Sequence, residues 1–221
     1  MLKNYDEDLK EIKNGIKVIG EKILLSNKTL LEAAKKCDVE RFTEAKSYLK
    51  DLSLSLNGID NEIIKVLALY SPEAKDLREV VAYFKITNEL LRASSNTRSL
   101  IKAFVRDCES IDMELINSYV IPLQTSTIKA LELVVSMIDL NDTDELIDIM
   151  HEIVVEEDKT DELYAMLEKK IFTGLKDSGN FEKTHNILKA FRRSEKIADR
   201  AISIANLLLY IFKGGELHNI R

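Results

Sequence analysis

Residues 181–213 read FEKTHNILKAFRRSEKIADRAISIANLLLYIFK, a stretch without one Gly or Pro. The apolar positions that recur at helical spacing within it are Leu188, Phe191, Ile202 and Leu209. Residues spaced in this way lie on one face of a helix. Two glycines follow directly, at Gly214 and Gly215, and glycine readily takes the left-handed backbone that ends many helices. The stretch therefore predicts a long helix with one buried face.

The whole chain shares this shortage of helix-breaking residues. Its 221 residues include 7 Gly and 2 Pro, whereas average usage of about 12% would give roughly 26. Sandwiches, barrels and doubly wound α/β folds need many tight turns, and those turns depend on Gly and Pro. The chain is rich instead in Leu, Ile, Lys, Glu and Ala, which suit long helices. We therefore predict an all-α protein.

Six long helices follow from the apolar spacing and the few breakers. Their predicted ranges are 4–36, 39–70, 72–107, 111–138, 143–175 and 181–213. Ser71 before Pro72 is typical of a capped helix start, and Asn141 and Asp142 can cap the fifth helix. Helices of about thirty residues bury their apolar stripes by packing side by side, so we expect up-down bundles.

A weak internal repeat divides the chain into two halves. Asp60 precedes Leu91 by 31 residues in the first half, and Asp161 precedes Glu195 by 34 residues in the second. Similar elements at similar spacing indicate a duplicated unit. The simplest interpretation is two tandem three-helix bundles. Their predicted bounds are residues 1–109 and 110–221.

Charge and composition exclude several classes of protein. The chain carries 32 basic and 38 acidic residues, a net charge of −6, which argues against nonspecific nucleic-acid binding. Its N-terminus is charged throughout, unlike a signal peptide, and no apolar stretch approaches the ~18 residues of a membrane span. Cys37 and Cys108 fit no metal or redox spacing, so we expect buried thiols in a reducing compartment. These features predict a cytoplasmic protein.

Two pairs of carboxylates have the spacing of a metal site. Glu195 and Asp199 are four residues apart, so a helix places both on one face, and Glu157 and Asp161 repeat this spacing one helix earlier. Antiparallel packing of the two helices would bring four oxygen donors together. Such donors suit Mg²⁺, Mn²⁺ or iron.

A plainer interpretation of the same residues is a face of salt bridges. Arg192 can pair with Glu195, and Lys196 can pair with Asp199, because residues three apart are neighbours on a helix. Charged runs of this kind are usually solvated helix faces. The sequence alone leaves both interpretations open.

A third alternative is an enzyme with a di-iron centre. Glu182 and His185 form a Glu-x-x-His sequence, the element used by di-iron carboxylate bundles. Asp148 and His151 form only an imperfect second copy. No phosphate-binding loop, dinucleotide fingerprint or nucleophile elbow is present in the chain.

Two segments resemble a known family. Residues 72–80, PEAKDLREV, are similar to the Pro-x-Ala-x-Asp-Leu-Arg segment of the PhoU family of bacterial phosphate-signalling proteins. Residues 194–201, SEKIADRA, resemble that family's Leu-Glu-Arg-Ile-Gly/Ala-Asp-His-Ala motif, and residues 214–216 resemble its Gly-Glu end. The resemblance covers essentially the whole chain. It implies two tandem three-helix bundles without catalysis.

The resemblance also implies a function. PhoU proteins are cytoplasmic regulators that restrain phosphate-starvation signalling when phosphate is plentiful. They are thought to bridge the phosphate ABC transporter and a membrane sensor histidine kinase, and they are often homodimers. We therefore expect a nonenzymatic regulator that reaches the membrane only through its partners. A helical adaptor without a phosphate role is the remaining alternative.

Some family members bind iron or other divalent metals through Glu/Asp-x-x-x-Asp pairs, one site in each half. The matching residues in the second half of this chain are Glu157, Asp161, Glu195 and Asp199. The first half has Leu56, Leu91 and Ser95 at the matching positions, which leaves Asp60 alone. We therefore expect a divalent metal (iron, Mg, Mn or Zn) at most in the C-terminal half. We expect Leu91 to pack into the first bundle instead.

Overall fold

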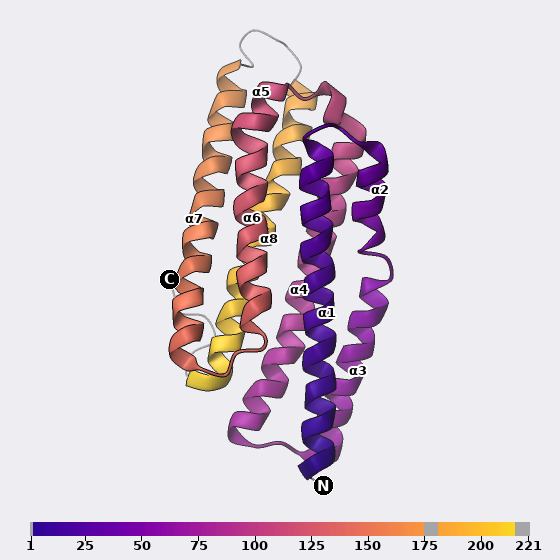
Figure 1. The fold of residues 1–221 in the computed structure, drawn as a ribbon, viewed down its shortest axis with the longest axis vertical. Helices are drawn as coiled ribbons and strands as arrows, with labels where there is room; N and C mark the ends of the chain where they lie inside the picture. The colour runs from indigo at the N-terminus through magenta and orange to yellow at the C-terminus, as the bar shows by residue number, and fades with distance from the viewer. Residues whose placement is uncertain (1, 175–180, 215–221) are drawn as a thin grey trace.

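The computed structural model describes residues 2–174 and 181–214, which form helices and no strand (Figure 1). The long helices are α1 (Leu2–Ala34), α3 (Leu52–Tyr70), α4 (Ala74–Asp107), α6 (Ile121–Met137), α7 (Thr143–Gly174) and α8 (Phe181–Lys213). The shorter ones are α2 (Val39–Ser47) and α5 (Met113–Leu115). The predicted all-α class is confirmed.

The helix predicted over residues 39–70 is broken into α2 and α3. Its buried residues keep an unbroken helical spacing across the break, at Phe42, Ala45, Leu49, Leu52, Leu56, Ile63 and Val66. Apolar periodicity therefore carries no sign of the turn. The guanidinium of Arg98 on α4 donates a hydrogen bond to the carbonyl of Leu49, and Asp51 takes a left-handed conformation with φ 57°. A hydrogen bond from another helix thus takes the place of the one that a continuous helix would make to the carbonyl of Leu49.

The helix ends follow the predicted signals in part. Asp142 caps α7, because its Oδ1 accepts hydrogen bonds from the backbone of Asp144 (3.0 Å) and Glu145 (2.9 Å). Gly214 ends α8 with φ +66°. The prediction for Ser71 is wrong: it does not cap α4 but ends α3, with its N–H on the carbonyl of Leu67. The breaker at residues 176–180 and Gly215 lie outside the described residues.

Cys37 and Cys108 form a disulfide, which corrects the expectation of two separate thiols. Cys37 follows the end of α1 and Cys108 follows the end of α4, with their Cα atoms 5.6 Å apart. They are 71 residues apart in sequence, so only the packing of α1 and α2 on α4 brings them together. The structure thus removes the argument that the cysteines indicate a reducing compartment.

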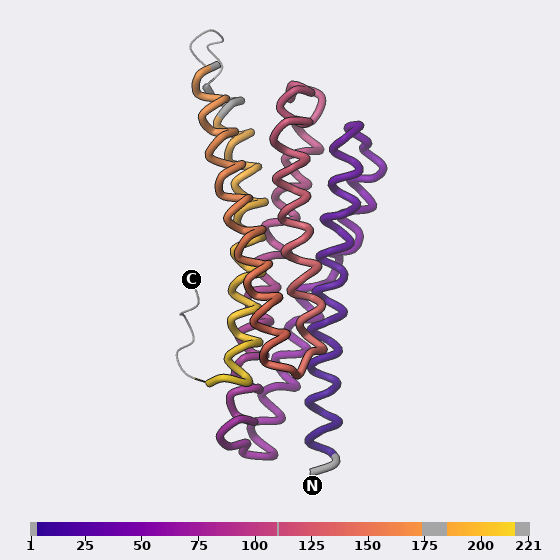
Figure 2. Tube along the Cα trace, turned by 60° about the vertical axis from the view of Figure 1, so that its left-hand side comes forward, coloured from indigo at the N-terminus to yellow at the C-terminus, as the bar shows by residue number. Residues whose placement is uncertain are grey.

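The helices form two groups that lie side by side (Figures 1 and 2). In the first group α2 and α3 pack with α1 and α4, and in the second α6, α7 and α8 pack on one another. Helix α4 packs along α8 and α1 packs along α6, so one continuous core joins the groups. A 3₁₀ turn (Cys108–Ser110), α5 and a π-helical turn (Ile116–Val120) connect them. The division at residue 109 stays a prediction.

Within residues 2–174 and 181–214, the structure contains no helix with both the length and the apolar character needed to cross a bilayer.

Candidate metal centre

Helices α7 and α8 bring three of the four predicted carboxylates together. Glu157 and Asp161 lie one turn apart on α7, and Asp199 faces them from α8. Each offers one oxygen, and these oxygens all lie within 4.8 Å of one another. Glu157 is buried, Asp199 is half-buried and Asp161 is exposed. The three carboxylates are called the acidic cluster below.

The acidic cluster has the chemistry and nearly the spacing of a divalent metal site. Two oxygens that bind one ion at about 2.1 Å each lie at most about 4.2 Å apart, so small side-chain movements would suffice. An ion would also offset the repulsion between the three carboxylates. The donor set is all oxygen, which fits hard and borderline cations.

Glu195, the fourth predicted ligand, points elsewhere. Its side chain is only 5% exposed, and its Oε2 lies 2.7 Å from Nε of Arg192. The Arg192 N–H is not aimed at this oxygen, so Oε2 is buried without a hydrogen bond. Burial raises the pKa of Glu195, and the nearby charge of Asp199 raises it further. Glu195 thus flanks the acidic cluster without belonging to it.

The predicted salt bridges are formed alongside the acidic cluster. Lys196 Nζ lies 3.0 Å from Asp199 Oδ2 and 3.4 Å from Glu195 Oε1. Together with the Arg192–Glu195 pair, these contacts form the salt-bridged helix face that was the plainer interpretation of the sequence. The two interpretations therefore share Asp199, and a bound ion would compete there with Lys196.

A further buried carboxylate, Glu156, was not selected from the sequence. Its Oε1 accepts hydrogen bonds from Lys159 on the same helix (2.8 Å) and Lys129 on α6 (3.1 Å). Burial alone would raise its pKa, but the hydrogen bonds from Lys159, Lys129 and Ser126, together with the charge of Lys129, lower it. The i,i+3 spacing of Glu156 and Lys159 was the available signal. Glu156 serves the packing of α6 on α7.

The matching face of the first half has different chemistry. Asp60 on α3 accepts a hydrogen bond of 2.6 Å from the hydroxyl of Thr87 on α4. Leu56 is buried and Ser95 is exposed. Leu91 is 38% exposed, so the prediction that it packs into the core is wrong; the neighbouring Leu90 takes that place, 4% exposed. No carboxylate other than Asp60 occupies a matching position.

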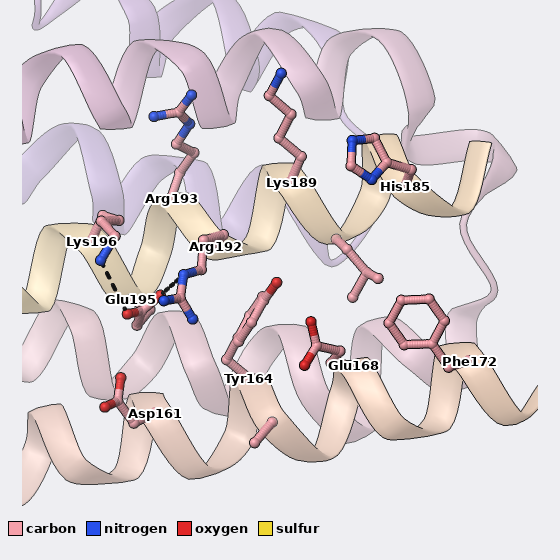
Figure 3. A pocket seen from close by; sticks show the side chains of 12 residues that line it. Asp161, Tyr164, Glu168, Phe172, His185, Lys189, Arg192, Arg193, Glu195 and Lys196 are labelled. Carbon is pink, nitrogen blue, oxygen red and sulfur yellow. Dashed lines mark hydrogen bonds and ion pairs between the residues drawn. The ribbon is translucent and has the colours of Figure 1, made fainter. Parts of the chain in front are cut away.

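A cleft of about 950 Å³ lies beside the acidic cluster, between α7 and α8. Figure 3 shows Tyr164, Glu168 and Phe172 extending from α7 toward α8, whereas Lys189 and Arg193 extend away from α7. The Arg192 guanidinium lies over the Tyr164 ring, 4.9 Å from its centre. Asp161 and Glu195 border the cleft, so it gives solvent access to the edge of the cluster.

The histidines proposed for a di-iron centre do not share a site. His185 lines the cleft together with Phe172, whereas His151 is exposed 21 residues earlier on α7. At a rise of 1.5 Å per residue, this spacing corresponds to about 30 Å along the helix. The side chain of Glu182 lies outside the described part of the chain. The imperfect second motif at Asp148 therefore does not complete the first.

In a comparison with known families, the part of the chain that contains the acidic cluster matches a family model. Residues 122–208, which include the whole acidic cluster, match the family model described as the PhoU domain. The chain carries a PhoU domain. Full-length relatives extend the similarity beyond this domain, and the resemblance noted in the sequence is confirmed.

Two curated relatives are similar over nearly the whole chain, and both are named "Phosphate-specific transport system accessory protein PhoU homolog". The protein from Aquifex aeolicus is 26% identical over 219 residues, covering 97% of this chain and 93% of its own length. The protein from Borreliella burgdorferi is 23% identical over 220 residues, covering 99% and 94%.

Solved PhoU structures share the fold. The crystal structure of PhoU from Pseudomonas aeruginosa matches with a TM-score of 0.83 at 18% identity, over 96% of this chain and 100% of that chain. The phosphate transport system regulatory protein PhoU from Streptococcus pneumoniae gives 0.83 at 21% identity, over 98% and 100%. At these identities the match establishes the helical architecture.

Proposed function

We propose that this protein is a nonenzymatic regulator of phosphate uptake and phosphate-starvation signalling. It restrains the starvation response when phosphate is plentiful, by binding a phosphate ABC transporter and a sensor histidine kinase. It acts in the cytoplasm as a homodimer and reaches the membrane only through these partners. The observation that carries the proposal is the PhoU domain at residues 122–208, together with relatives named as phosphate transport accessory proteins.

The geometry of the site supports a regulator more than an enzyme. Among the described residues, cations paired with Asp199 and with Glu195 lie beside the acidic cluster. The two histidines of the di-iron alternative lie far apart. Binding of a cation would change the net charge of a site built from charge pairs. A partner protein can sense such a change.

We further propose that the acidic cluster binds one divalent metal ion, and that the first half binds none. Glu157, Asp161 and Asp199 are the ligands, with Glu195 beside them as a buried carboxylate that balances the ion's charge. Asp60 lacks acidic neighbours at the matching positions and is bound by Thr87. Iron, Mg²⁺, Mn²⁺ and Zn²⁺ all accept oxygen ligands, and availability decides among them.

Deletion of the gene tests the regulatory proposal. We expect a phosphate-starvation reporter to be expressed at high phosphate in the deletion strain, and to be silenced again by a plasmid copy of the gene. Phosphate uptake should rise together with the reporter. A deletion strain in which both remain as in the parent at high phosphate would contradict the proposal and leave the helical adaptor.

Mn²⁺ titration of the purified chain tests the metal proposal. We expect Glu157→Gln and Asp199→Asn each to weaken Mn²⁺ binding at least tenfold, because each removes one of three charged ligands. Asp60→Asn is the matched control and should leave the affinity unchanged. Binding that survives Asp199→Asn, or that is lost with Asp60→Asn, would refute the assignment of the ligands.

A further inference from the structure

Arg200 on α8 connects the acidic cluster to the first half of the molecule. One guanidinium nitrogen lies 2.8 Å from Glu89 Oε2 on α4, and another lies 3.4 Å from Asp199 Oδ2. The side chains of Arg200, Glu89 and Asp199 are 15%, 15% and 19% exposed. One arginine is therefore shared between a carboxylate of each half, at the interface where α4 packs along α8.

The partial burial of these groups makes their charges matter. Exposed ion pairs contribute little because water screens them, whereas screening is weaker for groups largely removed from water. Glu89 has a second cation available, since Arg92 lies 3.6 Å from its Oε1 and is largely exposed. Arg200 contacts two carboxylates, those of Glu89 and Asp199. Its position depends on the balance between the two.

A divalent ion in the acidic cluster would change this balance. The ion takes oxygen ligands from Asp199 and repels the guanidinium beside it. Arg200 can then keep its charge compensated by turning fully to Glu89. We propose, resting on the metal site proposed above, that Arg200 is a switch residue: Glu89 holds it away from Asp199 when the ion binds, so that occupancy of the second half strengthens an ion pair to the first half.

This arrangement makes the effect of Glu89 on the ion indirect. Glu89 favours ion binding because it compensates Arg200, and Arg200 opposes ion binding because it occupies Asp199. A simple sum of charges would instead let each residue act on the ion independently. The two mechanisms differ in the double variant, in which both partners of the pair are removed.

The experiment measures Mn²⁺ affinity by calorimetry in four full-length proteins: the parent, Glu89→Gln, Arg200→Gln and the double variant. We expect Glu89→Gln to weaken binding about fivefold or more and Arg200→Gln to strengthen it by a similar factor, within the range of typical coupling energies. The double variant should bind as tightly as Arg200→Gln alone, because Glu89 acts only through Arg200.

The matched control is Glu132→Gln, which removes an exposed carboxylate paired with Lys28 on α1 and should leave the affinity unchanged. Circular dichroism verifies that each variant is folded. A double variant that returns to the parental affinity would overturn the switch in favour of independent charges. Single variants that shift affinity in the same direction, or not at all, would also overturn it.

The outcome separates this inference from the metal site itself. A folded parent that binds no Mn²⁺ would refute the metal site and the switch together. A parent that binds Mn²⁺ through Asp199, with additive effects of Glu89 and Arg200, would refute the switch alone. By linkage, Mn²⁺ should also raise the melting temperature of the parent more than that of Glu89→Gln.

Discussion

At the scale of single residues, the buried carboxylates of α7 and α8 are stabilised in different ways. Glu156 has two lysines as hydrogen-bond donors, and its pKa is lowered. Glu195 has Arg192 and Lys196 nearby, yet burial and the charge of Asp199 raise its pKa. Burial disfavours the negative charge of both carboxylates, and the neighbours of each one decide whether that effect is reversed.

Replacing Glu156 by Gln should therefore reduce stability in a pH-dependent way. The folded pKa of Glu156 lies below its unfolded value, so its contribution is present above the unfolded pKa and is lost as pH falls through the folded pKa. At neutral pH we expect a loss of about 1–2 kcal/mol. In urea unfolding, the parent and the variant should converge as the pH falls through the folded pKa of Glu156. A difference that persists or grows in acid would contradict this account.

The sequence allowed the local ion pairs of the site to be predicted, but not the long-range ones. Arg192–Glu195 and Lys196–Asp199 follow from helical spacing alone, and both are formed. Arg200–Glu89 joins residues 111 apart, which no local pattern indicates. The same limit explains why Glu195 was expected among the ligands: spacing placed it on the right face, but its carboxylate lies against Arg192 and Lys196.

At the scale of helices, apolar periodicity located four of the six predicted helices closely. It missed the break between α2 and α3, and the helix predicted over residues 111–138 consists of α5, the π-helical turn and α6. The buried positions of α2 and α3 keep the same spacing through the turn. The break depends on Arg98, which binds the carbonyl of Leu49 from another helix. A turn stabilised by a tertiary contact leaves no local signature in the chain.

The backbone of Asp51 offers a test at this turn. Its φ of 57° lies in the left-handed region, which is disfavoured for residues with a Cβ atom and free of that penalty for glycine. We expect Asp51→Gly to raise the free energy of unfolding by about 0.5–1 kcal/mol. Asp51→Ala should lower it instead. If urea denaturation shows equal effects for the two variants, the turn does not have this conformation in solution.

The disulfide between the ends of α1 and α4 offers a second test. Closing a loop of 71 residues restricts the unfolded chain and stabilises the folded state by up to ~4 kcal/mol. We expect Cys37→Ser to lose this contribution and to unfold at the same urea concentration with and without dithiothreitol. The parent should match the variant only when reduced. A parent unaffected by reduction would show that the cysteines are not paired.

At the scale of the whole molecule, a chain of buried hydrogen bonds crosses from one half to the other. Ser194 Oγ on α8 donates to Gln124 Oε1 on α6 (2.8 Å), and Gln124 Nε2 donates to Asn27 Oδ1 on α1 (2.8 Å). Asn27 Nδ2 donates to Thr97 Oγ1 on α4 (3.1 Å). All four residues are at most 3% exposed. Four helices of both halves thus share one satisfied polar network.

The sequence pattern did not predict this network, because its members are isolated polar residues on otherwise apolar faces. Composition and periodicity predicted the helices, since these depend on which residues are apolar. The register between the halves depends on a few hydrogen bonds between residues 70 to 97 apart. Those contacts form only after the helices pack. Ser194, which makes one of them, directly precedes Glu195 beside the acidic cluster.

The buried hydrogen bonds of this network should contribute to the free energy of unfolding. Gln124→Ala leaves buried groups on Asn27 and Ser194 without partners, so we expect it to lower the free energy of unfolding by about 2–4 kcal/mol. Ser194→Ala alone should lower it by about 1–2 kcal/mol. Because both variants break the same hydrogen bond, the double variant should lose at least about 0.5 kcal/mol less than the sum of the two. Thr125→Ala, on the exposed face of the same helix, is the control and should change stability by less than about 0.5 kcal/mol. Strictly additive losses in urea denaturation would mean that the residues stabilise the halves separately and that the network does not couple them.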